Sequence, residues 1–183
     1  MYENIMNVTK QLIRTNGMQF TISAIAKELR ISSKTIYKHF VNKEEIILAI
    51  IHELKNESDT YQMEVLNDDS ISHFCKLNLL LTRLPRDYDI INYRNTVYIK
   101  LTYPRAYELM LNIYKEDWNR FEEVYKAGMK HEDFREIDLV IFKEMYIASI
   151  TQLPLLQELS EYNHKELLTR IVSLLLNGVK LQS

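Results

Sequence analysis

The stretch from Thr21 to Ile46, TISAIAKELRISSKTIYKHFVNKEEI, contains three helix starts of the same kind. Each start has a side chain that can accept hydrogen bonds from the first free backbone N–H groups of a helix, namely Thr21, Ser32 and Asn42. Apolar residues flank each cap at the spacing at which they pack across the first turn, in the pairs Phe20 with Ile25, Ile31 with Ile36, and Val41 with Ile46. The pattern predicts helices at about 22–29, 33–39 and 43–57, and Glu45 completes an Asn-x-x-Glu capping box with Asn42.

The residues around these starts predict a helix-turn-helix. An amphipathic helix is expected over residues 2–15, with apolar positions that include Ile5, Val8, Leu12 and Ile13, and Gly17 ends it. The short link Arg30-Ile31 leaves the next two helices no room to run side by side, so they must cross steeply. Ala26 is small where such a crossing needs a close approach.

The outward residues of the short helix at 33–39 can all donate hydrogen bonds, and none is acidic. They are Ser33, Lys34, Thr35, Tyr37, Lys38 and His39. A helix that recognises bases in the major groove of DNA needs donors and short hydroxyls near its N-terminus, flanked by cations and hydroxyls for phosphate. The alternative is an ordinary solvated polar face. Within a capped three-helix unit we favour DNA recognition.

The charge distribution supports the same interpretation. The net charge is −2, but residues 1–55 hold eight Lys/Arg and five Asp/Glu, whereas residues 56–183 hold fifteen and twenty. A modest positive excess at one end of the chain can meet phosphate without making the whole protein bind nucleic acid unspecifically.

The quoted stretch closely resembles the DNA-binding signature of the TetR family of transcriptional regulators. The resemblance implies that the helix at 33–39 enters the major groove and that the following helix presents its N-terminus to the DNA backbone. On this sequence it implies base contacts by Ser33, Lys34, Thr35 and Lys38, and phosphate contacts by Thr21, Tyr37, His39 and Lys43. Ser32 joins this DNA-binding set at the start of the recognition helix, and Phe40 is expected in the core.

Arg30 departs from the family pattern, because many members have glycine in the turn. Two arrangements are possible: either Arg30 accepts a left-handed conformation at some energetic cost, or the turn is built differently.

The rest of the chain is also expected to be helical, because it has few of the glycines and prolines that many-stranded proteins need at their turns. Periodicity, with breaks at Pro85, Pro104 and Pro154, predicts helices at about 70–84, 87–103, 105–130, 136–153 and 163–180. Residues 58–69 are ambiguous and could extend the fourth helix. The prediction is an all-α protein of about nine helices, with a DNA-binding domain at 1–45 and an effector-binding and dimerisation domain at 46–183.

The last two predicted helices are apolar around most of their circumference and therefore need cover on all sides. TetR-like proteins dimerise through such a pair, so we expect an isologous homodimer that binds a palindromic site. The alternative is that one chain buries both helices. The predicted interface comprises Phe142, Met145, Ser149, Leu153, Leu168, Ile171, Val172 and Leu175.

The middle of the chain is rich in tyrosine, with nine of the twelve between residues 61 and 146. These residues could line a mostly apolar pocket for a small lipophilic or aromatic effector. Aromatic residues at helical spacing are, however, more often core, and surface pairing is the alternative role for Asn78 and Arg94. The predicted pocket comprises Asn78, Arg94, Tyr98, Tyr103, Tyr107, Met110, Tyr114, Trp118 and Met145.

Other classes of protein find little support. His52 and Glu53 begin a zinc-protease motif, but Asn56 stands where the second histidine is needed. The chain has no phosphate-binding glycine loop or nucleophile elbow, so we expect no enzyme, cofactor or metal. Cys75 is the only cysteine, and no apolar run has the length of a signal peptide or membrane span, which predicts a cytoplasmic protein. The remaining alternative is a helical partner-binding protein whose N-terminal unit is a protein interface.

Overall fold

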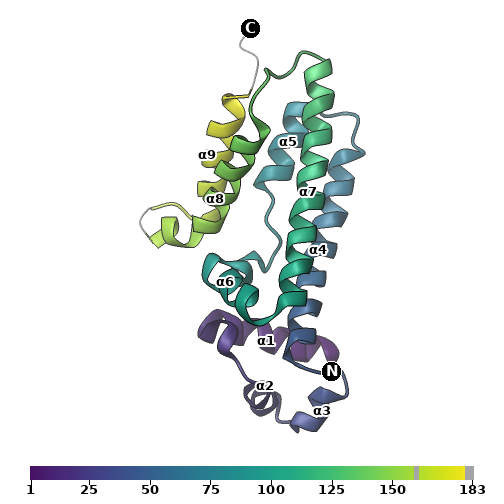
Figure 1. Ribbon diagram of the computed structural model, residues 1–183, viewed down its shortest axis with the longest axis vertical. Coiled ribbons are helices and arrows are strands. Elements are labelled where there is room, and N and C mark those ends of the chain that lie inside the picture. The colour runs from purple at the N-terminus through teal and green to yellow at the C-terminus, as the bar shows by residue number, and fades with distance from the viewer. Residues whose placement is uncertain (159–160, 180–183) are drawn as a thin grey trace. The chain divides into compact units, whose positions relative to one another are not determined.

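The computed structural model describes residues 1–158 and 161–179 and is built from helices (Figure 1). Within these ranges there are nine α-helices, two short 3-10 helices and no β-strand, which confirms the predicted all-α class. The chain forms two compact units, each discontinuous in sequence. Unit 1 comprises Met1–Glu57 and Pro85–Ile113, and unit 2 comprises Ser58–Leu84 and Tyr114–Ser183. The predicted domain boundary between residues 45 and 46 stays a prediction.

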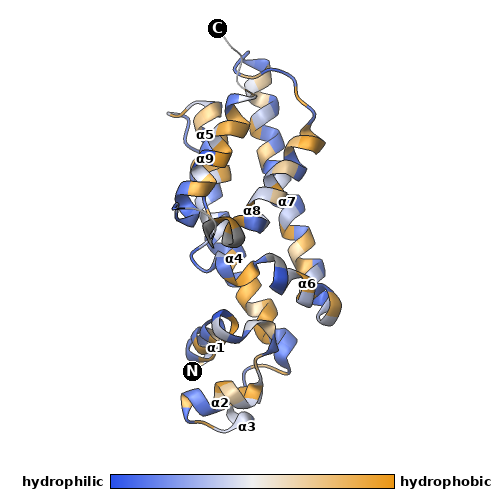
Figure 2. Cartoon of the chain, turned by 90° about the vertical axis from the view of Figure 1, so that its left-hand side faces the viewer, coloured by the Kyte–Doolittle hydropathy of each residue, from blue (hydrophilic) through white to orange (hydrophobic). Residues whose placement is uncertain are grey.

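Unit 1 begins with a bundle of short helices: α1 (Tyr2–Asn16), η1 (Gly17–Gln19), α2 (Ile22–Leu29) and α3 (Ser33–Tyr37). Helix α1 packs on α2, and α2 packs on α3. Figure 2 shows that α1 and α2 each carry both hydrophobic and hydrophilic residues, as helices with one buried face do. The buried faces meet in a core that includes Ile5, Ile25, Ile36 and Ile46, each of which is fully buried.

Unit 1 also contains η2 (Tyr88–Ile91) and α6 (Tyr93–Thr102), where the sequence predicts one helix at 87–103. That prediction is wrong because Asn92 is extended and starts a new helix. Its side chain accepts a hydrogen bond from the Asn95 backbone N–H at 2.9 Å. The buried Asn95 side chain donates in turn to the Ile90 carbonyl at 2.8 Å, which fixes the break.

Two long helices, α4 (Lys43–Leu66) and α7 (Pro104–Lys130), contribute residues to both units. Helix α4 resolves the ambiguity over residues 58–69, because it continues to Leu66. Unit 2 further contains α5 (His73–Thr82), α8 (Leu139–Glu158) and α9 (His164–Asn177). Helix α9 packs on both α5 and α8.

The core of unit 2 is a chain of stacked aromatic rings. Phe121 lies between Trp118, at a centroid distance of 4.5 Å, and Phe142, at 5.2 Å. Tyr125 extends the chain to Phe134 at 5.7 Å. The Phe134 ring lies directly against Gly128, where a Cβ atom would come within 2.1 Å of the ring, so the packing requires glycine there.

Candidate nucleic-acid interface

The three predicted helix caps are confirmed. The Thr21 hydroxyl accepts a hydrogen bond from the Ala24 N–H at 3.1 Å, and the Ser32 hydroxyl accepts one from the Thr35 N–H at 3.2 Å. The Asn42 side chain accepts one from the Glu45 N–H at 3.0 Å. These bonds satisfy donors that the helix itself cannot pair, so the sequence fixes where α2, α3 and α4 begin.

Two details of the predicted caps are wrong. The Glu45 carboxylate binds the Arg105 guanidinium at 2.7 Å rather than returning to Asn42, so only the first bond of a capping box forms. Val41 is 81% exposed and therefore does not cover the first turn of α4 with Ile46. Glu45 pairs instead with Arg105, which lies 60 residues further along the chain, and local spacing cannot reveal such a partner.

The turn between α2 and α3 places Arg30 in the left-handed conformation, with φ 54° and ψ 41°. The Ile31 N–H donates to the Ala26 carbonyl at 3.0 Å, and the Arg30 N–H donates to the Lys27 carbonyl at 3.2 Å. This pair of bonds is a Schellman motif, which normally has glycine at the left-handed position. The first predicted alternative is therefore confirmed, at a cost of roughly 1–2 kcal/mol for a residue with a Cβ atom.

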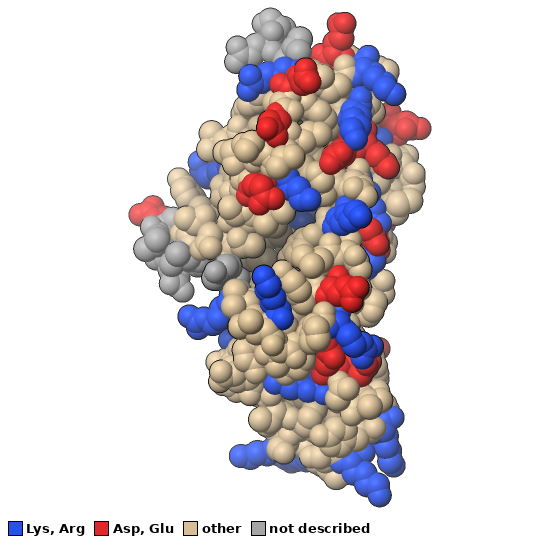
Figure 3. Space-filling view, viewed as in Figure 1, with Lys and Arg blue, Asp and Glu red and all other residues tan. Residues whose placement is uncertain are grey.

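Helix α3 presents polar side chains to solvent. Lys34, Tyr37, Lys38 and His39 are exposed, and Tyr37 keeps 52% of its surface accessible. The Ser32 and Thr35 hydroxyls lie 3.0 Å apart across the first turn, which keeps both near the N-terminus of α3. Figure 3 shows Lys and Arg side chains without acidic neighbours at the end of unit 1 that α2 and α3 form. Phe40 is buried and stacks on Tyr2 at 4.9 Å, which confirms its predicted place in the core.

Lys43 lies closer to protein than the sequence suggests. Its ammonium donates to the Met18 carbonyl at 2.6 Å and lies 4.2 Å from the centroid of the Phe20 ring. Burial lowers the pKa of Lys43 from its ordinary value, and burial raises that of the nearby Tyr103 to about 12. In this structure Lys43 therefore links the first residue of α4 to η1.

A cluster of five charged residues joins α1 to the segment before α6, and no local sequence pattern predicts it. Lys10, whose side chain is only 5% exposed, donates to Glu53 of α4 at 2.6 Å and to Asp87 at 2.8 Å. Arg14 binds both Asp87 and Asp89. Burial opposes ionisation of Lys10 and Asp87, but their mutual hydrogen bond and the further charged partners outweigh burial. The pKa of Lys10 is therefore raised, and the pKa of Asp87 is lowered.

Comparison with known proteins assigns the helix-turn-helix. Residues 5–50 match the family model described as bacterial regulatory proteins of the tetR family. The chain therefore carries a helix-turn-helix of the TetR type. Over 181 residues it is 24% identical to the HTH-type transcriptional regulator YvaF of Bacillus subtilis, a match that covers 98% of this chain and 95% of the relative.

Solved structures share the fold of this chain over nearly all of its length. A transcriptional regulator from Saccharomonospora viridis, crystallised with choline, matches with a TM-score of 0.81 and 19% identity and covers 99% of this chain and 98% of its own. The regulator FadR from Bacillus subtilis, crystallised with stearoyl-CoA, matches with a TM-score of 0.68 and 20% identity, covering 97% and 99% respectively.

The residues predicted to line an effector pocket are divided between the two units of the regulator. Unit 1 contains Arg94, Tyr98, Tyr103, Tyr107 and Met110, and unit 2 contains Asn78, Tyr114, Trp118 and Met145. Met110 and Trp118 are buried, whereas Met145 is 53% exposed. Tyr98 and Tyr103 lie 6.1 Å apart between ring centroids. Their role as a pocket stays a prediction.

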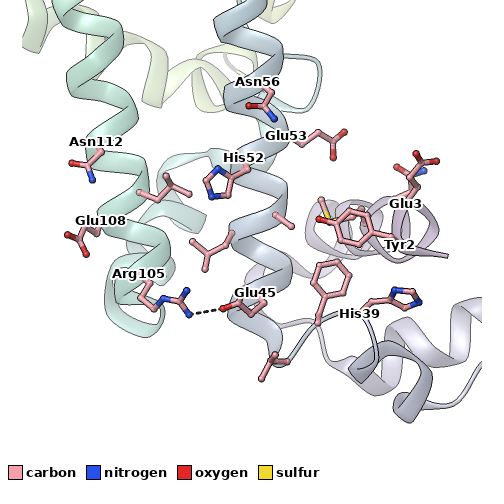
Figure 4. Close-up of a pocket in the computed structure, with 17 residues that line it drawn as sticks. Tyr2, Glu3, His39, Glu45, His52, Glu53, Asn56, Arg105, Glu108 and Asn112 are labelled. Atoms are coloured by element: carbon pink, nitrogen blue, oxygen red, sulfur yellow. Dashed lines mark hydrogen bonds and ion pairs between the residues drawn. The ribbon is translucent and has the colours of Figure 1, made fainter.

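A groove of about 1090 Å³ lies within unit 1 of the regulator (Figure 4). Its walls come from the first turns of α1, the residues between α3 and α4, one face of α4 and the start of α7. Arg105 and Glu45 form an ion pair across it. None of the residues predicted for the effector pocket lines this groove.

The predicted dimer residues differ in exposure. Phe142, Leu153, Leu168 and Val172 are buried in the core of unit 2, while Ser149, Ile171 and Leu175 are partly exposed. Other apolar residues of the same two helices are more open to solvent: Val140 is 68%, Ile141 56% and Leu174 76% exposed. Periodicity could not separate these positions in α8, whose apolar residues are spread around the helix. Helix α9 instead has one buried face, with Leu168, Val172 and Leu176, and an exposed polar face, so the expectation that it is apolar around most of its circumference is wrong.

The described residues contain no group of three or more His, Cys, Asp or Glu side chains that could hold a metal ion. Within the same part of the chain, no helix has both the length and the apolar character needed to cross a membrane.

Proposed function

We propose that this chain is a TetR-type repressor that binds a palindromic operator as a homodimer and releases it when a small effector binds. The observation that carries the proposal is the capped helix-turn-helix with an exposed α3 rich in hydrogen-bond donors. Ser33, Lys34, Thr35 and Lys38 contact bases or lie beside them in the major groove. Thr21, Ser32, Tyr37, His39 and Lys43 hold the adjoining backbone, and Lys43 must leave the Met18 carbonyl to do so.

The apolar surface of α8 and α9 supports the homodimer. Val140, Ile141, Met145 and Leu174 are each more than half exposed, and a second copy of the same surface is the simplest cover for them. The predicted interface residues that are buried within one chain, such as Leu153 and Leu168, then support this surface by packing α8 against α9. A two-fold axis presents two copies of α3 to successive major grooves, so the operator is palindromic.

The effector is a small lipophilic or aromatic molecule bound by the effector-binding and dimerisation domain expected at residues 46–183. The chain offers buried and half-buried aromatic rings with a few hydroxyls, among them Tyr98, Tyr103, Tyr107, Tyr114 and Trp118. Regulators of the same fold have been crystallised with choline and with stearoyl-CoA, which supports binding of a small molecule by this one. Release follows if the effector changes the spacing of the two α3 helices, because both half-sites must be held at once. The protein acts in the cytoplasm and uses neither metal nor cofactor.

A gel-shift assay with DNA flanking the regulator's own gene tests the proposal. Tyr37→Ala and Lys34→Ala should each weaken binding about tenfold, because a good side-chain contact to DNA contributes on the order of 1–3 kcal/mol. Lys165→Ala is the matched control, since Lys165 is an exposed lysine on α9 and should have no effect. Equal binding by wild type and both α3 variants would contradict the contact assignment. Sedimentation of wild type and of Leu174→Glu tests the dimer. Wild type should be a dimer at micromolar concentration, and the charge in Leu174→Glu should weaken it. A monomeric wild type would refute the dimer.

A further inference from the structure

Arg30 is held in a backbone conformation that arginine rarely adopts. Its φ of 54° is one of two positive values among the non-glycine residues that the structure describes, the other being 59° at Glu132. Glycine or asparagine suits such a position better, because a larger side chain crowds the carbonyl in the left-handed region. The Schellman bonds of Arg30 and Ile31 fix this conformation, so the strain is part of the folded turn.

The side chain of Arg30 does nothing within the chain to offset this strain. It is exposed, and its guanidinium forms no hydrogen bond, ion pair or ring contact with any residue in the described ranges. Packing and internal charge pairing therefore give no reason for arginine at this position.

The position of Arg30 suggests what the guanidinium binds. It lies two residues before Ser32, which caps α3, so its Cα atom is within about 8 Å of the start of the recognition helix. Exposed Lys27 and Lys34 lie on either side in sequence, and Glu28 is the only acidic residue between Thr21 and Lys43. A recognition helix inserts its N-terminal end into the major groove, and backbone phosphates line the edges of that groove. The planar guanidinium is well suited to two parallel hydrogen bonds with a phosphate.

We propose that Arg30 is a DNA-contact residue whose guanidinium binds a backbone phosphate at the edge of the major groove entered by α3. The inference rests on the proposed DNA-binding function and adds to it a contact that the predicted set does not contain. The turn retains a strained arginine because its charge strengthens DNA binding, although glycine would suit the backbone better. Since phosphates are the same in every sequence, Arg30 contributes affinity without base preference.

The test compares Arg30→Gly, Arg30→Asn and Arg30→Lys with wild type. Fluorescence anisotropy measures affinity for DNA flanking the gene and for an unrelated duplex, over about 50 to 200 mM salt. Arg30→Gly and Arg30→Asn should weaken binding to both duplexes about fivefold and reduce the slope of log affinity against log salt by about 0.9 per bound arginine. Arg30→Lys keeps the charge and should keep the slope.

Thermal unfolding separates the contact from the fold. Arg30→Gly removes the strain, so its melting temperature should equal or exceed that of wild type while its DNA affinity falls. Glu132→Gly is the matched control, because it relieves the same conformation in unit 2 and should leave the salt slope unchanged.

Two results would overturn the Arg30 contact while wild type binds DNA. One is wild-type affinity and slope in both Arg30→Gly and Arg30→Asn. The other is a loss in Arg30→Lys as large as that in Arg30→Gly, which would show that the charge is not responsible. Failure of wild type to bind either duplex at any salt concentration would instead overturn the proposed function, and the contact with it.

Discussion

Both units have apolar cores, and they differ in the interactions that accompany those cores. In unit 1, the charged cluster of Lys10, Arg14, Glu53, Asp87 and Asp89 joins α1 and α4 to the segment before α6. In unit 2, stacked aromatic rings fill the core between α7 and α8. Charge pairs weaken with salt and with protonation, whereas burial of apolar surface depends little on either. The charged cluster should therefore make the stability of unit 1, which carries the recognition helix, depend on salt and pH, whereas the contribution of the aromatic stack in unit 2 should depend little on either.

The largest expected effect is in the aromatic core. Phe121→Ala removes a ring that is 2% exposed and stacked on both sides, which should lower the free energy of unfolding by about 3–5 kcal/mol. Urea unfolding at low and high salt should give the same loss. Met63→Ala is the control, because Met63 is 48% exposed in the same unit and its loss should be minor. A salt-dependent loss at Phe121 would break the contrast between the units.

Lys10→Ala should have the next largest effect, about 3 kcal/mol, because it leaves Glu53 and Asp87 facing each other without their buried cation. Lys10→Met removes the same charge but fills the space, and should cost less. Lys27→Ala is the matched control, since Lys27 is exposed on α2. The contrast fails if the alanine and methionine variants are both as stable as wild type in urea.

The effect of Asp87→Asn on stability should depend on pH. Hydrogen bonds and charges from Lys10 and Arg14 outweigh the opposing effect of burial and lower the pKa of Asp87 in the folded state. A lowered carboxyl pKa stabilises the fold above the unfolded pKa of about 3.9, and this stabilisation is lost as pH falls through the folded pKa. Asp87→Asn should therefore cost about 2 kcal/mol at neutral pH and progressively less below about pH 4. Urea unfolding as a function of pH measures it, and a loss that does not change with pH would contradict the linkage.

The smallest effect is expected at Arg14→Gln. Arg14 is 38% exposed, so solvent screens its pairs with Asp87 and Asp89, and the loss should be about 0.5 kcal/mol at low salt. High salt should abolish it, whereas the loss at the more deeply buried Lys10 should persist. If both losses vanish together in a salt series, burial does not distinguish the two cations.

The sequence predicted those features that depend on near neighbours. Three helix caps show this: Thr21, Ser32 and Asn42 each accept a hydrogen bond from the backbone N–H three residues later. Side-chain type and spacing were therefore sufficient to locate them. The contacts of Lys10 span 43 and 77 residues, and they form only when three separate segments come together. Likewise, the apolar residues of α8 are spread around the helix, so spacing could not tell buried Leu153 from exposed Val140.

Within the candidate site, the same distinction holds. Exposure of Lys34, Tyr37 and Lys38 agrees with the donor-rich surface predicted for α3. The attachment of Lys43 to Met18 could not be foreseen, because it depends on where η1 lies 25 residues earlier in the chain. The unpartnered side chain of Arg30 was likewise beyond the sequence, which identified only the unusual residue in the turn.

Trp118 is the only tryptophan in the chain, and it lies in the aromatic core of unit 2. Its stacking on Phe121 makes its fluorescence sensitive to the packing of that unit, while the helices of unit 1 contain no such fluorophore. Unfolding followed by tryptophan emission therefore reports on unit 2, and circular dichroism reports on the helices of both. A difference between the unfolding midpoints from tryptophan emission and from circular dichroism would show that the DNA-binding helices unfold separately. The native chain needs no added label for this measurement.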